Sequence, residues 1–377
     1  MPMPSAEDAV VPRVRSRAAF VLSTVLNKKL ESWTGGCPIL INLFREQYGS
    51  KTSPNVPRPN NFVVTSQNLQ QYFVMQALPQ AVSRLRQQSG EYFDDVFSFI
   101  MNLIKLNDNS MNRYADDFYR AALYNSLTGC VVPCEVLPLH IHLPENLSPD
   151  VRSMIQEFTY ALNMDTINPS FGRVVGVAAL TGIYQLQKNG YMPLDSRLLF
   201  SFADPKCCTQ MRRAAITLLV DRVSSDMFAG PSKLDDLVKL FNFARDDESP
   251  AIRRLIPRLL AATPPFVTSN NTDYSAANSC NTPEVAESLW RTITSSSVDP
   301  IVRQSFTDLY FSLYGLGVPP SIGGPAEAPG HHRCTYGSAP SATLQLSLNY
   351  WHSSSYEVAK RSPPRRDLDT SFGEALI

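Results

Sequence analysis

The chain has 377 residues, of which 44% are hydrophobic and 18% are charged. This length exceeds what one compact core usually holds, and the apolar fraction excludes a chain that is disordered throughout. The formal net charge is zero, which argues against a free-standing nucleic-acid binder held mainly by phosphate contacts.

Membrane insertion and secretion are not predicted. The purely apolar runs are far shorter than the roughly 18 residues that cross a bilayer. The first residues place prolines and charges where a signal peptide needs an apolar stretch, so we expect an unsecreted protein. The seven cysteines are an odd number in a long chain, which fits reduced thiols in the cytosol or nucleus.

Helices dominate the predicted structure. In residues 91–106, apolar side chains recur at helical intervals on one wide face, with Asp94, Asp95, Asn102 and Lys105 off it. Similar patterns predict helices over residues 66–88, 111–127, 153–162, 173–186, 211–222, 234–243, 252–261, 283–294 and 301–314. Pro79 and Pro257 fall inside two of these and are expected to kink or split them. Strands are not expected, since no sustained two-residue alternation occurs.

Several helix starts share one sequence pattern. A capping side chain precedes proline at Ser148, Ser249, Thr282 and Asp299. Three of these starts continue to an arginine at the same offset, and a degenerate copy adds a fourth, which gives Arg152, Arg212, Arg253 and Arg303 at steps of 60, 41 and 50 residues. Steps of this size suit repeats of two helices, so we predict an all-α, HEAT/armadillo-like solenoid over residues 12–320. The alternative is an ordinary helical bundle whose helices are capped alike.

Other segments are predicted to lack regular structure. Residues 49–61, 133–149 and 263–282 are rich in proline or turn-forming residues and are expected to be loops. Residues 321–377 are rich in Gly, Pro and Ser, which predicts a disordered C-terminal tail.

The residues offer no sign of catalysis. The motifs H-E-x-x-H, G-x-S-x-G and G-x-x-x-x-G-K-[ST] are all absent, so we predict no enzyme, no catalytic residue and no cofactor. Cys130, Cys134, His140 and His142 are acceptable zinc ligands that lie close in sequence, but their spacing matches no common zinc site. A loop with two half-buried thiols is the favoured alternative, and we predict no metal.

The most distinctive segment is residues 103–123. It contains a polar turn between two helices, followed by a helix on which Asp116 and the residues three and four positions later are expected to share one face. One interpretation is a buried or half-buried polar network that fixes the turn, and the residues favour it. The other is a ridge that binds a partner, for which the candidates are Asn107, Asp108, Asn109, Asp116, Tyr119 and Arg120.

The same segment carries a family resemblance. Residues 103–123 (LIKLNDNSMNRYADDFYRAAL) and 147–164 (LSPDVRSMIQEFTYALNM) strongly resemble the C-terminal helical-repeat region of the TFIID subunit 2 family, as do residues 184–193, 260–266 and 308–318. The similarity runs from about residue 18 to residue 318. Full-length members resemble zinc aminopeptidases in their N-terminal portion, whereas this chain resembles only the solenoid.

The resemblance implies a function and a set of partners. It implies a non-catalytic nuclear scaffold of the general transcription factor TFIID, which supports core-promoter recognition and assembly of the RNA polymerase II preinitiation complex. The implied partners are other TFIID subunits, including the TATA-binding protein assembly, and promoter DNA within the complex; no membrane is implied.

Two questions stay open at this point. Strips of arginine could contact DNA directly, at positions 13, 15, 17, 212, 213, 253, 254 and 258. The alternative is that repeat arginines pair with acids of neighbouring repeats, which we favour for Arg152, Arg253 and Arg303. Rival functions are the C-terminal helical domain of a zinc aminopeptidase that lacks its catalytic part, and a transport or nuclear-import adaptor.

Overall fold

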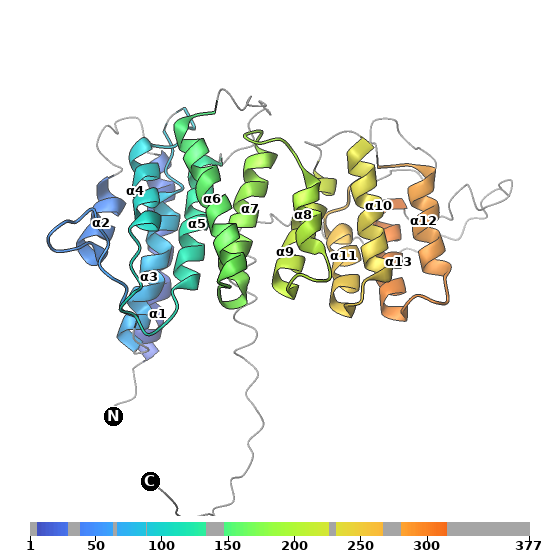
Figure 1. The fold of residues 1–377 in the computed structure, drawn as a ribbon, viewed down its shortest axis with the longest axis horizontal. Coiled ribbons are helices and arrows are strands. Elements are labelled where there is room, and N and C mark those ends of the chain that lie inside the picture. Colours follow the sequence, from blue (N-terminus) through green and yellow to red (C-terminus); the bar gives the residue numbers. More distant parts are fainter. Residues whose placement is uncertain are drawn as a thin grey trace, which may run out of the picture. The chain divides into compact units, whose positions relative to one another are not determined.

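Thirteen α-helices fill most of the described residues, and these residues contain no β-strand (Figure 1). The structure is a computed structural model that describes residues 6–28, 38–62, 66–87, 89–132, 147–225, 231–266 and 280–314. The helices are α1 (Ala6–Lys28), α2 (Pro38–Tyr48), α3 (Ser66–Val82), α4 (Asp94–Lys105), α5 (Asp117–Val131), α6 (Pro149–Ile167), α7 (Val174–Lys188), α8 (Ser196–Ala203), α9 (Thr209–Ser224), α10 (Pro231–Asp246), α11 (Pro250–Ala262), α12 (Pro283–Thr294) and α13 (Pro300–Tyr314), with a 3-10 turn, η3 (Phe171–Arg173), before α7.

The helices form two rows. Each odd-numbered helix packs against the next odd-numbered helix, from α1 to α13, which makes one continuous row. Each even-numbered helix packs against the odd-numbered helix that follows it, and Figure 1 shows the resulting pairs succeeding one another in chain order. Stacked helix pairs of this kind define a helical solenoid. The predicted all-α solenoid is therefore confirmed.

One hydrophobic core runs along the row. Its buried side chains extend from Ala19 to Tyr314 without a break into separate clusters. In α4 the predicted apolar face is the buried face, with Val96, Ile100 and Leu103 almost inaccessible to solvent. Burial of each such side chain stabilises the fold by about 1.5–3 kcal/mol. No single helix pair encloses this core, so every pair depends on its neighbours.

Two glycines allow close packing between helices. A Cβ at Gly182 would lie 2.5 Å from the ring of Phe158 on α6, and one at Gly176 would lie 2.5 Å from the Asp165 carboxylate. Gly172 has no such role, because it lies in η3 outside the helix, with φ of +60°.

The predicted helix caps are mostly confirmed. The side chains of Ser148 and Thr282 accept hydrogen bonds from the backbone N–H three residues on, and Asp299 accepts one from two residues on. The Ser249 side chain makes no such bond. Its own backbone N–H donates to the carboxylate of Asp247 instead, at 2.8 Å.

Other boundaries differ from the predictions. Helices α1, α2 and α8 were not predicted as separate elements. The helix predicted over residues 111–127 begins only at Asp117. Of the two outcomes expected at proline, a split is wrong, since α3 and α11 continue through Pro79 and Pro257, and a kink stays a prediction.

The repeat pattern needs one correction. Arg212, Arg253 and Arg303 are each the fourth residue of an odd-numbered helix, α9, α11 and α13. Arg152 lies in α6, an even-numbered helix. The steps of 41 and 50 residues therefore each span one helix pair, whereas the step of 60 residues does not.

Some predictions concern parts of the chain outside the described residues. Residues 49–61 contain no helix, as predicted. Most of the loops predicted over 133–149 and 263–282 lies outside, as does the whole tail 321–377.

The described residues belong to one compact unit, Met1–Gly324. None of their helices combines the length and the apolar character that a bilayer span requires.

Candidate functional site

The predicted site residues surround the turn between α4 and α5. Helix α4 ends at Lys105, where a basic side chain suits the negative end of the helix dipole. The chain then turns through residues 106–116, and Asp116 occupies the N-cap position of α5. Asn107, Asp108 and Asn109 therefore lie in the predicted polar turn.

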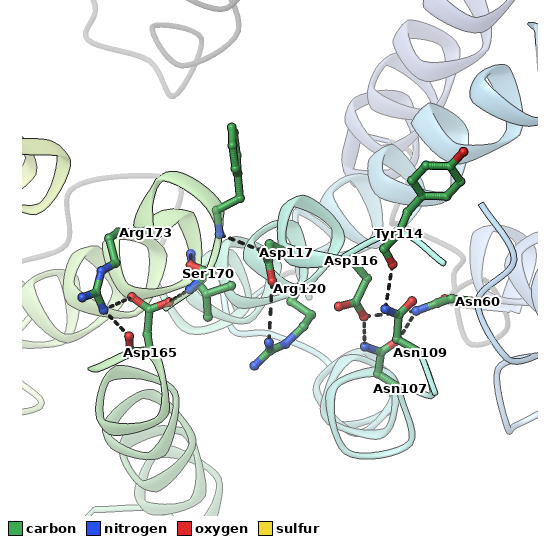
Figure 2. A network of polar contacts seen from close by, with 12 residues as sticks. Asn60, Asn107, Asn109, Tyr114, Asp116, Asp117, Arg120, Asp165, Ser170 and Arg173 are labelled. Carbon is green, nitrogen blue, oxygen red and sulfur yellow. Dashed lines mark hydrogen bonds and ion pairs between the residues drawn. The ribbon is translucent and has the colours of Figure 1, made fainter. Parts of the chain in front are cut away.

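A buried carboxylate organises this turn. Asp116 is only 5% exposed, and its Oδ2 accepts hydrogen bonds from the side-chain amides of Asn107, at 2.5 Å, and Asn60, at 3.1 Å. The Asn60 amide also donates to Asn107 Oδ1 at 3.0 Å. Figure 2 shows the three side chains converging. Burying a charge without hydrogen-bond partners costs free energy, and the hydrogen bonds from these two amides offset that cost.

Asn60 connects the turn to a distant segment. Its backbone N–H donates to the carbonyl of Asp108 at 2.7 Å, and its side chain is 7% exposed. The loop that follows α2 is thereby fixed to the start of α5. The sequence offered no signal for this residue, since Asn60 sits in a loop 56 positions before Asp116.

The exposed part of the turn is shaped by local hydrogen bonds. The backbone N–H of Ser110 donates to Asp108 Oδ1 at 2.9 Å, and this bond lowers the pKa of the Asp108 carboxyl. Asn109 donates to the carbonyl of Tyr114 at 3.0 Å, and its Oδ1 accepts from Asn112. The interpretation as a polar network that fixes the turn is thus confirmed.

The expected common face of Asp116, Tyr119 and Arg120 is wrong. Asp116 precedes the helix and its carboxylate faces Asn60 and Asn107 rather than the later residues. Tyr119 is 2% exposed, and burial raises the pKa of its hydroxyl. Arg120 lies 3.9 Å from Asp117, on the helix surface. The error arises because an N-cap residue does not have helical backbone angles.

Arg120 instead borders a groove. An open groove of about 500 Å³ lies among α4, α5 and α6, and it is lined by Ile104, Lys105, Asn107, Arg120, Leu123, Tyr124, Glu157 and Tyr160. Leu123 and Tyr124 are buried, and Tyr160 is 58% exposed. The groove therefore combines apolar side chains with charges of both signs, a combination that suits a protein segment.

The groove was only partly predicted. Asn107 and Arg120 were candidates, whereas Glu157 and Tyr160 on α6 were not. Burial raises the pKa of Tyr124 to about 12, although the nearby Arg120 acts in the opposite direction. This phenol therefore keeps its proton further into the alkaline range than an ordinary tyrosine, and the buried residue forms part of the groove lining.

The zinc hypothesis finds no support in the described residues, where no three potential metal ligands of the His, Cys, Asp and Glu types come together. Cys134, His140 and His142 lie outside the described part. Cys130 is buried, and burial raises the pKa of its thiol to about 12. This thiol is consequently a poor metal ligand and a poor nucleophile.

A second turn beside the groove presents aromatic rings. Phe118 on α5 and Phe171 in η3 are both exposed, and their ring centroids are 6.1 Å apart. The backbone N–H of Phe171 donates to the carboxylate of Asp117 at 2.7 Å. Next to it, Arg173 has φ of +57° and donates to the buried Asp165. These contacts fix the η3 turn against α5.

The comparison with known families agrees with this architecture. The sequence model of a family described as "TAF2-like, TPR repeats" matches residues 5–328. TPR repeats, like HEAT and armadillo repeats, are stacks of helix pairs. The family description thus assigns a repeat type to the helix pairs of the fold.

Curated relatives carry one common name, Transcription initiation factor TFIID subunit 2. The relative from Caenorhabditis elegans is 59% identical over 356 residues, which cover 94% of this chain and 32% of the relative. The relative from Gallus gallus is 34% identical over 81% of this chain and 25% of its own length. The one from Drosophila melanogaster is 33% identical over 81% of this chain and 24% of its own length.

This chain thus spans about a quarter to a third of the length of these relatives. The matched part is the stretch that folds into helix pairs, and the family model extends across nearly all of the described residues. Family model, relatives and fold agree: the chain belongs to the TFIID subunit 2 family and comprises its TAF2-like TPR-repeat region.

Proposed function

We propose that this chain acts as a non-catalytic scaffold within TFIID, supporting core-promoter recognition and assembly of the RNA polymerase II preinitiation complex in the nucleus. The observation that carries the proposal is the 59% identity over 94% of the chain to a protein named TFIID subunit 2. The row of helix pairs supports it, because a solenoid offers long surfaces for other chains without a deep reactive pocket.

The groove among α4, α5 and α6 is the proposed docking site for another TFIID subunit. Asn107 and Arg120 line it directly. Asp108, Asn109, Asp116 and Tyr119 act indirectly in this proposal, since they fix the turn and the first residues of α5 that form one wall. A groove with an apolar floor and charged rims can hold a short segment through side-chain anchors and peripheral ion pairs.

The proposed partners are the subunits that assemble with the TATA-binding protein, and promoter DNA within the complex. The zero net charge of the chain gives it little attraction for DNA on its own. DNA contact is accordingly proposed for the assembly rather than for the isolated chain.

Affinity purification tests this function. The tagged chain is recovered from nuclear extract and its partners are identified by mass spectrometry. We expect the TATA-binding protein and its associated factors to be recovered. Their absence, with the chain outside the nucleus, would refute the proposal.

A pair of variants tests the groove. Arg120→Glu reverses a charge on the groove rim, and Arg197→Glu makes the same change on α8, where the arginine is almost fully exposed. We expect reduced recovery of one or more TFIID subunits with Arg120→Glu and normal recovery with Arg197→Glu. Equal recovery with both would remove the groove from the proposal while leaving the scaffold function intact.

A further inference from the structure

The N-terminal ends of α9, α11 and α13 carry arginines in equivalent positions. The fourth residue of each helix is Arg212, Arg253 and Arg303 respectively. Two chain reversals separate one odd-numbered helix from the next, so these helices run in the same direction and their N-terminal ends lie along one edge of the row. Positive side chains are unusual at helix N-termini, because they face the positive end of the helix dipole. A nearby negative group would offset this unfavourable interaction.

The first of the three positions shows what such an arginine binds. Arg212 is buried; its Nη2 forms an ion pair with Asp247, and its Nε donates to the carbonyl of Ala203 at 2.9 Å. Asp247 belongs to the loop that leads into the next odd-numbered helix, two residues before the N-cap of α11. The equivalent position before α13 is Ser297, which offers no charge.

The other two arginines lack such partners in the described part of the chain. Neither Arg253 nor Arg303 forms an ion pair there, and their buried Nε atoms, like that of Arg254, have no hydrogen-bond acceptor. The favoured prediction that Arg253 and Arg303 pair with acids of neighbouring repeats is therefore wrong, whereas Arg212 does form such a pair.

The carboxylate of Asp299 lies near Arg253 and Arg254. The pKa of the Asp299 carboxyl is lowered, first by the hydrogen bond from the backbone N–H of Ile301 and further by the charges of Arg254 and Arg253. Asp299 is engaged as the cap of α13, and no ion pair joins it to either arginine within 4 Å. Asp299 therefore lies close enough to Arg253 and Arg254 to feel their charge, but it neutralises neither of them through a direct ion pair.

We propose that the N-terminal ends of α11 and α13 bind an acidic segment of a partner protein, whose carboxylates contact Arg253, Arg254 and Arg303. The intramolecular pair favours carboxylates, since the equivalent arginine of α9, Arg212, binds the carboxylate of Asp247. Asp299 within the cluster and the zero net charge of the chain disfavour a continuous phosphate backbone. This inference goes beyond the scaffold function and concerns a surface distant in sequence from the α4–α6 groove.

Geometry specifies the spacing of the acids. Packed helices lie about 8–10 Å apart, and an extended peptide advances about 3.3 Å per residue. Carboxylates three positions apart thus match neighbouring helix ends. Arginine binds carboxylates with paired hydrogen bonds, which makes the interaction sensitive to this placement.

Binding of fluorescent peptides to the full 377-residue chain tests the proposal. The probe is an extended peptide with aspartate at every third position, and the controls are the same peptide with asparagine, a peptide with its aspartates adjacent, and a duplex DNA. We expect the spaced aspartate peptide to bind best by fluorescence anisotropy. Preferential binding of the duplex would overturn the proposal in favour of a nucleic-acid site, and failure of the aspartate peptide to bind would overturn it outright.

A matched pair of variants locates the site. The double variant Arg254→Gln/Arg303→Gln should bind the aspartate peptide about tenfold more weakly, the loss expected for about 1.4 kcal/mol of charge-assisted bonding. Arg197→Gln on α8 should bind it normally. Equal affinity of both variants would contradict the assignment, and their circular dichroism melting curves report whether each is folded. Co-purification with TFIID tests the scaffold function separately, so the two proposals can fail independently.

Discussion

Removing the Asp116 carboxylate should destabilise the fold substantially. Its Oδ2 accepts hydrogen bonds from Asn60 and Asn107 at a position only 5% exposed. A hydrogen bond to a charged group contributes about 1.5–3 kcal/mol, and the cost of burying the carboxylate offsets part of the two bonds. We therefore expect Asp116→Ala to lower the free energy of unfolding by about 2–4 kcal/mol.

Urea unfolding followed by circular dichroism measures this effect. The transition midpoint should fall for Asp116→Ala, and Asp116→Asn should lie between it and the parent chain, because an amide retains one acceptor oxygen. Asp108→Ala is the control, since that carboxylate is exposed and bonds only to the turn, and it should unfold like the parent. A change below about 0.5 kcal/mol for Asp116→Ala, the range of ordinary surface substitutions, would refute the view that this carboxylate joins the loop before α3 to α5.

Three further predictions follow from buried contacts. Arg212→Ala should cost about 3–5 kcal/mol of unfolding free energy, because it strands a buried aspartate; an unchanged urea midpoint would contradict this. Gly182→Ala should lower the melting temperature, since its Cβ would meet the Phe158 ring at 2.5 Å, and a stabilised protein would show that the helices can separate freely. Burial raises the pKa of the Cys130 thiol from 9.0 to about 12. Between pH 9 and 12 the unfolded chain therefore loses the thiol proton while the folded chain keeps it, so the free energy of unfolding should fall over this range. A Cys130→Ala variant should lose part of this pH dependence, and a stability profile identical to that of the parent chain would refute the prediction.

Sequence patterning alone was sufficient for the class of fold. Apolar side chains at helical intervals, as in α4, and proline-preceded caps such as Ser148 and Thr282 report local preferences that the tertiary structure then used. The steps of 41 and 50 residues between Arg212, Arg253 and Arg303 also indicated helix pairs correctly, because each arginine is the fourth residue of an odd-numbered helix.

Only the tertiary structure decided which residues of the candidate site meet. The sequence predicted Asp116 on a helical face with Arg120. In the structure the Asp116 carboxylate accepts hydrogen bonds from Asn60 and Asn107, and Arg120 lines the groove. The physical reason is distance along the chain. Local patterning reports which face of a helix is apolar, but contacts between loops far apart in sequence depend on how the helix pairs stack, and that stacking is set by the whole core.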